Sequence, residues 1–192
     1  MSNTVALISL GCAKNLVNSE QMMYLLDKAG FSLTGDVSEA DAVVINTCGF
    51  IDSAVSEAID SILETASRKL NGYPKIIVAG CLAERFRKSI REEMPEVDAV
   101  IGTGGYGEVA DVVAAALGGE TPEVYPDINA PTEECGRIVS TPPWTAYIKI
   151  AEGCDNCCSY CVIPSLRGRF RSRRFEDIVA EAEELVKSGA RE

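Results

Sequence analysis

Short apolar runs alternate with amphipathic stretches through the first 117 residues of the 192-residue chain. Such runs are typical of strands buried on both faces, and apolar residues that recur every three or four positions are typical of helices. We expect strands at 5–10, 42–45, 75–79 and 99–101, and helices between Leu16 and Gly30 and at about 53–70, 84–93 and 108–117. Strands that alternate with helices predict an α/β fold whose parallel sheet is covered on both faces.

The pattern changes after residue 117. Residues 118–143 contain five prolines and show no helical periodicity, which is typical of a linker. An apolar segment at 144–150 indicates a further strand, and 176–187 indicates a helix that ends at Ser188-Gly189. We therefore predict a domain at 1–117, a linker at 118–143 and the start of a second domain at 144–192.

The net charge of −11 lies entirely in residues 1–143, because residues 144–192 hold eight basic and eight acidic residues. An acidic first domain argues against charge-driven binding of nucleic acid, since phosphate is neutralised by Lys and Arg. The chain has no histidine, which excludes a His base and His-ligated zinc. No apolar run is long enough to span a membrane. Eight cysteines without a secretory signal indicate the reducing cytoplasm and metal binding rather than disulfides.

Three cysteines occupy equivalent places in the repeated pattern. Cys12, Cys48 and Cys81 each lie at or just past the carboxyl end of a predicted strand. In a parallel sheet these ends meet at one edge, which is where ligands bind. A buried structural cysteine is the simpler interpretation of any one of them. Three equivalent placements favour a shared metal site.

Four more cysteines crowd into the segment CDNCCSYC at 154–161. Cys154, Cys158 and Cys161 form a C-x3-C-x2-C frame, whose three thiolates suit an iron–sulfur cluster with one iron left unligated by protein. All four, including Cys157, would instead suit a tetrahedral zinc site. The residues alone leave both interpretations open.

Two other motifs are weaker. Residues 102–107, GTGGYG, match the dinucleotide fingerprint G-x-G-x-x-G, but no further βαβ unit follows them, so a tight turn is the better interpretation. Five arginines between 167 and 174 have no acidic residue among them. Such a run is typical of a solvated basic face, although arginines beside a site for carboxylates could bind anions.

Several of these segments resemble the methylthiotransferase family of radical S-adenosylmethionine (SAM) enzymes. SLGCAKN at 9–15, NTCGF at 46–50 and AGC at 79–81 resemble the three cysteine motifs of its N-terminal domain. AYIKIAEGC at 146–154, the C-x3-C-x2-C frame and VIPSLRG at 162–168 are similar to the start of its radical SAM domain. Lys14-Asn15 is closer to the branch that modifies a ribosomal protein than to the branch that modifies tRNA, although Ala13 stands where proline is usual.

This resemblance implies a parallel-sheet, cluster-binding domain followed by the first β/α unit of a radical SAM (TIM-like) barrel. It implies two [4Fe–4S] clusters: one carries the sulfur to be transferred, and the other binds SAM at its open iron, with Tyr160 near the adenine. Because one strand and one helix cannot form a barrel, we expect an N-terminal portion of a longer protein that is inactive alone. The implied metal ligands are Cys12, Cys48 and Cys81 for the first cluster and Cys154, Cys158 and Cys161 for the second.

The implied activity is addition of a methylthio group to the β-carbon of an aspartate in the twelfth small-subunit ribosomal protein. The partners it implies are that ribosomal protein and an electron donor of the flavodoxin or ferredoxin type, with no membrane. One alternative keeps the chemistry but takes an adenosine of tRNA as substrate. Another is a non-enzymatic interaction module that is stabilised by a structural zinc ion. Under the cluster interpretation we expect Cys157 to point away, and Cys135 falls in the linker, outside both cysteine groups.

Overall fold

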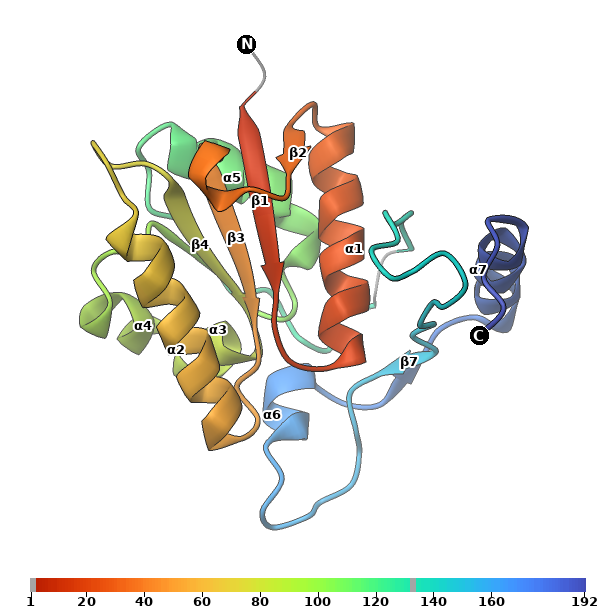
Figure 1. Ribbon diagram of the computed structural model, residues 1–192. Helices are drawn as coiled ribbons and strands as arrows, with labels where there is room; N and C mark the ends of the chain where they lie inside the picture. Colours follow the sequence, from red (N-terminus) through yellow and green to blue (C-terminus); the bar gives the residue numbers. More distant parts are fainter. Residues whose placement is uncertain (1–2, 132–133) are drawn as a thin grey trace.

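A six-stranded parallel sheet forms the centre of the molecule in a computed structural model that describes residues 3–131 and 134–192 (Figure 1). Its strands are β1 (Thr4–Ser9), β2 (Ser32–Thr34), β3 (Ala42–Thr47), β4 (Lys75–Gly80), β5 (Ala99–Ile101) and β6 (Glu123–Val124). Their order across the sheet is β2-β1-β3-β4-β5-β6. Ser9 of β1 lies opposite Asn46 of β3, and Thr47 of β3 lies opposite Gly80 of β4. The carboxyl ends of these three strands therefore reach the same edge.

Helices cover both faces of the sheet. α1 (Ala13–Lys28) and α5 (Val109–Leu117) pack on one face, while α2 (Asp52–Ser67), α3 (Cys81–Phe86) and α4 (Lys88–Glu93) pack on the other. Successive residues of β3 alternate between the two cores, because side chains of a strand point to opposite faces: Val43 and Ile45 face α2, and Val44 faces α1. The prediction of a parallel sheet covered on both faces is confirmed.

The four predicted strands are confirmed at nearly the expected bounds. The prediction missed the edge strands β2 and β6, which are only three and two residues long and only partly buried. So short an element gives no period that the sequence could show. The single helix expected at 84–93 is wrong: α3 and α4 are separated at Arg87, whose φ of 39° lies in the left-handed region and interrupts the helix. Short 3-10 helices, η1 (Val37–Glu39) and η2 (Tyr106–Glu108), lie in the connections.

The C-terminal part of the chain is irregular. It contains an antiparallel pair, β7 (Ala151–Glu152) and β8 (Arg171–Ser172), with α6 (Ile163–Arg167) between them and α7 (Phe175–Lys187) after them. The helix expected at 176–187 is thus confirmed. The strand expected at 144–150 is wrong, because the described residues supply no neighbouring strand along this segment to share its hydrogen bonds. Nor do the described residues form a β/α barrel, so the expected opening barrel unit is not present as such.

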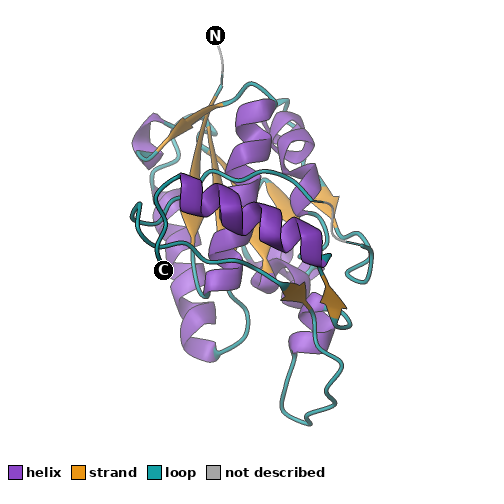
Figure 2. Ribbon diagram, turned by 90° about the vertical axis from the view of Figure 1, so that its right-hand side faces the viewer, coloured by secondary structure: helices purple, strands orange, loops and turns teal. Residues whose placement is uncertain are grey.

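The stretch predicted as a linker is fastened to α1. The buried Glu20 carboxylate of α1 accepts hydrogen bonds from Arg137 Nη1 at 3.2 Å and from the backbone N–H of Ser140 at 2.7 Å. Arg137 also lies 3.0 Å from Glu181 of α7. Figure 2 shows α7 lying across the α1 side of the molecule. These contacts hold the C-terminal part in place, and β6 within the same stretch joins the sheet.

No helix in the described part of the chain combines the length and the apolar character needed to cross a membrane.

Leu26 tests the core between α1 and the sheet. Its side chain is fully buried, so Leu26→Ala is expected to lower the free energy of unfolding by about 2–5 kcal/mol, through lost apolar burial and the cavity left behind. Urea denaturation followed by circular dichroism measures the change. Leu63 of α2 is 46% exposed, and Leu63→Ala is the control, with an expected change within about 0.5 kcal/mol. Equal losses in the two variants would contradict the assignment of this core.

Candidate functional site

The carboxyl edge of β1, β3 and β4 carries three cysteines. Cys12 precedes the first residue of α1, Cys48 follows β3, and Cys81 opens α3 directly after β4. Since β1, β3 and β4 are adjacent in the sheet, residues distant in sequence become neighbours. The Cys81 thiol interacts electrostatically with those of Cys48 and Cys12. The structure thus brings together the three cysteines that the repeated pattern singled out.

Two glycines allow the three loops to approach one another. A Cβ placed on Gly11 would lie 2.6 Å from Cβ of Cys48, and Gly11 has φ of +90°, which other residues rarely adopt. A Cβ on Gly49 would lie 2.8 Å from the carbonyl oxygen of Cys81. Each glycine is the sequence neighbour of one cysteine and packs against another. The edge is therefore too tightly packed for side chains at 11 and 49.

The three thiols differ in exposure. Cys12 is exposed, Cys48 is half-buried and Cys81 is buried. Burial raises the pKa of the Cys81 thiol, because a buried thiolate loses its hydration, and the guanidinium of Arg167 offsets part of this rise. The guanidinium of Arg167 thus lies near the Cys81 thiol. The deepest thiol of the group therefore has a cation beside it.

Buried amides fix the geometry of this edge. Asn46, near the end of β3, donates from Nδ2 to the carbonyl oxygen of Asn15 and to Oγ of Ser19, both at 2.9 Å. Asn15 in turn donates to the carbonyl oxygens of Leu10 and Thr47, both at 3.0 Å. Buried polar groups need such partners to offset their lost hydration. Together these bonds set the position of the first turn of α1, and hence of Cys12, relative to β3.

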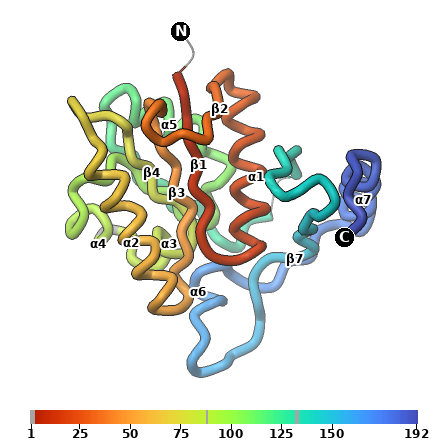
Figure 3. Tube along the Cα trace, in the orientation of Figure 1, coloured from red at the N-terminus to blue at the C-terminus, as the bar shows by residue number. Residues whose placement is uncertain are grey.

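The second cysteine group lies on the loop between β7 and α6, which extends away from the sheet (Figure 3). Cys157 and Cys158 are exposed, whereas Cys154 and Cys161 are half-buried. The loop closes at its base, where the backbone N–H of Cys154 donates to the carbonyl oxygen of Gly168 at 3.1 Å. Tyr160 is 84% exposed. The loop holds its cysteines at the surface.

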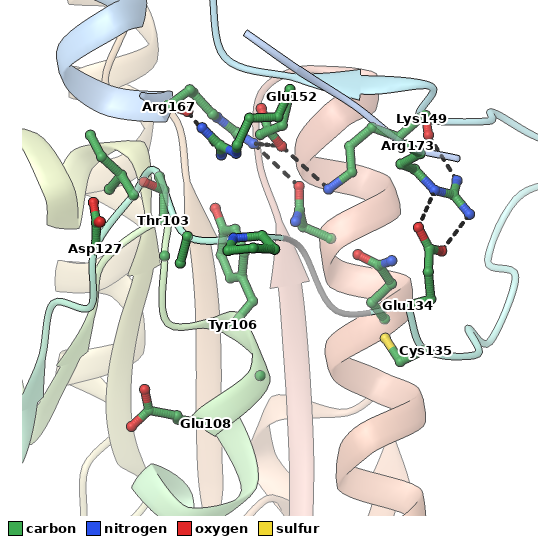
Figure 4. A pocket seen from close by; sticks show the side chains of 18 of the residues that line it. Thr103, Tyr106, Glu108, Asp127, Glu134, Cys135, Lys149, Glu152, Arg167 and Arg173 are labelled. Atoms are coloured by element: carbon green, nitrogen blue, oxygen red, sulfur yellow. Dashed lines mark hydrogen bonds and ion pairs between the residues drawn. The ribbon is translucent and has the colours of Figure 1, made fainter. Parts of the chain in front are cut away.

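A buried ionic network joins the two regions (Figure 4). Arg167, at the end of α6, donates from Nη1 to Glu152 of β7 at 3.1 Å and from Nη2 to the side-chain oxygen of Asn15. Lys149 lies 3.3 Å from the same carboxylate. Burial tends to raise the pKa of Glu152, but Arg167 and Lys149 hold that pKa below its usual range. Lys14 of α1 lies 3.6 Å from the other carboxylate oxygen, so Glu152 is a buried anion compensated by three cations.

The arginine run does not form a uniform basic face. Arg167 is buried, and Arg173 pairs with Glu134 and Glu181. Arg169 and Arg174 have mostly exposed side chains, as a solvated face requires. The interpretation as a solvated run is therefore wrong for Arg167 and Arg173, because both meet carboxylates from other parts of the chain that a local pattern cannot show.

Sequence reasoning missed several residues that shape this site. Their signal was weak: Lys149 and Glu152 fall inside the AYIKIAEGC string and Asn15 inside SLGCAKN, but nothing in the sequence pairs these segments. The residues first identified by the structure are Asn15, Asn46, Lys149, Glu152 and, in a buried role, Arg167.

A cavity of about 390 Å³ lies beside the network, between α1, the loop before α5 and the C-terminal part (Figure 4). Tyr106, Glu152, Arg167 and Arg173 are among its lining residues. Of the cysteines in the described part of the chain, Cys135 lines it, and neither cysteine group does. The cavity is thus separate from both cysteine groups.

The glycine motif at 102–107 forms a packed turn. A Cβ on Gly102 would lie 2.2 Å from a carboxylate oxygen of Glu84, and one on Gly104 would lie 2.9 Å from the carbonyl oxygen of Pro126. Protein atoms thus occupy the space that a diphosphate would need above these two residues. The prediction of a tight turn rather than a nucleotide site is consistent with this packing.

The donor chemistry fits iron–sulfur clusters. Among the described residues, no three His, Cys, Asp or Glu side chains converge closely enough to hold a single metal ion. A cluster has a different requirement, because each cysteine ligates a separate iron and the sulfurs are spread around the cluster. Thiolates are the soft ligands that iron–sulfur clusters take. The groups at 12, 48 and 81 and at 154, 158 and 161 each offer three of them.

Asn46 tests the framework of the cysteine edge. Asn46→Ala would leave Ser19 Oγ and the carbonyl oxygen of Asn15 without the hydrogen bonds that Asn46 donates, which is expected to cost about 1–3 kcal/mol of unfolding free energy. Urea denaturation measures the loss, and Asn3→Ala at an exposed position is the control. A change at position 46 no larger than at position 3 would show that these bonds do not hold the edge.

Comparison with known proteins places this site in a family. The model of "Uncharacterized protein family UPF0004" matches residues 4–102, which is more than half of the chain. Proteins named "Ribosomal protein uS12 methylthiotransferase RimO" are 49% identical in Trichlorobacter lovleyi over 193 residues and in Pelotomaculum thermopropionicum over 199, and 48% identical in Thermoanaerobacter sp. over 189. The alignments cover 98–100% of the chain and 42–44% of these relatives, so the chain spans less than half their length. By the family match, the chain belongs to Uncharacterized protein family UPF0004.

Proposed function

We propose that this chain is the cluster-bearing part of a radical SAM methylthiotransferase that acts on ribosomal protein uS12 in the cytoplasm. The observation that carries the proposal is the meeting of Cys12, Cys48 and Cys81 at one edge of the sheet, packed together through Gly11 and Gly49. Three thiols gathered from three separate strands have no evident structural task that smaller apolar residues would not perform. The names of the relatives supply the reaction and the substrate.

Each cysteine group has its own role in the proposal. Cys12, Cys48 and Cys81 would hold one [4Fe–4S] cluster, and Cys154, Cys158 and Cys161 a second, to which SAM binds with Tyr160 beside the adenine. When bound, these groups supply one-electron chemistry and the sulfur and methyl donors. The residues of the chain hold the two sites in fixed relation. Arg167 lies against Cys81, and Glu152 lies two residues before Cys154, so both stand between the sites.

The choice between a ribosomal protein and tRNA rests on the relatives and not on Lys14-Asn15. Lys14 Nζ donates to the carbonyl oxygen of Ala151 at 3.0 Å, and Asn15 accepts from Arg167. Both residues therefore attach α1 to the C-terminal part, and these contacts do not bear on the substrate. The electron donor of the flavodoxin or ferredoxin type is part of the proposed reaction and remains a prediction.

Iron content tests the proposal directly. Anaerobic reconstitution of the chain with iron and sulfide should give about eight irons and eight sulfides per chain, because two cubane clusters hold four of each. Replacing Cys12, Cys48 and Cys81 together with Ala should leave about half of each, since the other site is independent. Cys135→Ala, a cysteine outside both groups, is the control and should keep the full content. Full iron content in the triple variant would contradict the assignment of the first site.

Cys157 separates the cluster from the zinc interpretation. In the structure Cys157 is exposed and its thiol lies 3.9 Å from the carbonyl oxygen of Asp155. If Cys154, Cys158 and Cys161 form the ligand set, Cys157→Ser should keep the second cluster, whereas Cys158→Ser should lose it. Iron analysis and visible absorbance measure the difference. Bound zinc in the wild type, lost equally in both variants, would instead support a four-thiolate zinc site.

A further inference from the structure

Arg167 occupies a place between the two cysteine groups. It ends α6, which begins two residues after Cys161, and its side chain is 4% exposed. Its guanidinium donates to Glu152 in β7 and to Asn15 in α1, and it lies near the Cys81 thiol at the start of α3, against which α6 packs. One side chain therefore contacts the strand before the second cysteine loop and two elements of the first cysteine site.

Hydrogen bonds of the surrounding backbone also close the loop at its base. Cys154 N–H donates to the carbonyl oxygen of Gly168 at the base of the loop, and Thr103 Oγ1 donates to the carbonyl oxygen of Leu166. α6 also packs against α3, which Cys81 begins. The loop that carries the second group is thus fastened at both ends next to the first group, and Arg167 provides the charged contacts of that fastening.

Burial explains why arginine stands here. A buried guanidinium must have its donors satisfied, and its planar fork can reach several acceptors at once, which an ammonium group cannot do with the same geometry. Glu152 supplies the compensating charge. Removing Glu152 would leave Arg167 and Lys149 without the carboxylate that they share. Removing Arg167 would leave Glu152 with two lysines but without its bond to the end of α6, so the contact favours one arrangement of the two regions.

We propose that Arg167 is a positioning residue that couples the two cysteine sites: it holds the loop at 154–161 against the edge that carries Cys12, Cys48 and Cys81, and it places a positive charge on that edge. This inference rests on the proposed function for what the sites bind. The attachment of the loop is a property of the chain itself and can be measured without metal.

Hydrogen exchange on the metal-free 192-residue chain tests the attachment. In Arg167→Met, the hydrogen-bonded amides of Cys154, Leu166 and Gly168, at the base of the loop and in α6, should exchange at least tenfold faster, while β3 and β4 should keep their protection. Glu152→Gln keeps the shape of its side chain but removes the charge, and it should weaken protection of the same amides. It also provides a test if Arg167→Met does not fold. Arg174→Met is the control, because Arg174 belongs to the same arginine run, its side chain is 78% exposed, and its ion pairs with Glu176 and Asp177 lie outside the loop.

The reduction potential of the first cluster tests the placed charge. The measurement uses a reconstituted variant in which Cys154, Cys158 and Cys161 are replaced by Ala. In this variant, Arg167→Met should make the reduction potential of the first cluster more negative by about 59 mV, which for one electron is about a tenfold fall in the ratio of reduced to oxidised cluster. Loss of a nearby cation disfavours the more negative, reduced cluster. Mere exposure of the cluster to water would shift the potential the other way. Arg167→Lys should bring the reduction potential most of the way back to the wild-type value, because it keeps the positive charge. It should not restore the protection of the loop amides, because lysine lacks the planar guanidinium that reaches several acceptors.

The outcomes separate this inference from the proposed function. Unchanged exchange of the Cys154, Leu166 and Gly168 amides in both Arg167→Met and Glu152→Gln, or an equal effect in Arg174→Met, would overturn the coupling by Arg167. An unchanged or more positive potential in Arg167→Met would overturn the placed charge. If the wild-type chain takes up no iron and sulfide, the proposed function fails, and hydrogen exchange still decides whether Arg167 holds the loop.

Discussion

The shared direction and register of β1, β3 and β4 are the constraint on which the rest of the structure depends. Parallel strands in register end at one edge, so the residues just past the end of one strand become neighbours of those just past the ends of the others. Here a cysteine stands there each time, with Gly11 and Gly49 removing the side-chain bulk that would keep the loops apart. The site is therefore a product of sheet topology first and of local chemistry second.

The buried charges beside this edge determine how the C-terminal part is placed more than they add to the stability of the fold. Taking Arg167 and Glu152 out of water has a large desolvation cost, and the attraction between them roughly offsets it, so such a pair is weak evidence for added stability. What the pair does specify is position, because each charge has few acceptable partners. Glu20, Arg137 and Glu181 repeat this arrangement farther along α1. Two ionic networks thus fix the C-terminal part to the same helix, and α1 serves as the common support.

The C-terminal part shows the opposite case, in which local sequence predicts structure that its surroundings do not support. Residues 144–150 have the composition of a strand, yet Trp144, Tyr147 and Ile150 are exposed and the backbone is irregular. A strand is stabilised by the strands beside it, and the described residues offer none there. In the sheet domain, by contrast, β3 and β4 each lie between two neighbouring strands.

The sequence by itself determined the four central strands, the covering helices α1, α2 and α5, and the placement of Cys12, Cys48 and Cys81 at the carboxyl ends of three strands. It could do so because burial on both faces leaves continuous apolar runs and because cysteine spacing is a local property. Only the tertiary structure decided that α3 and α4 are separate helices, that Arg167 is buried against Cys81 and Glu152, and that Asn15 and Asn46 fix the first turn of α1. These features depend on contacts between residues far apart in the chain, and no periodicity or spacing encodes which distant partner a buried polar group will meet.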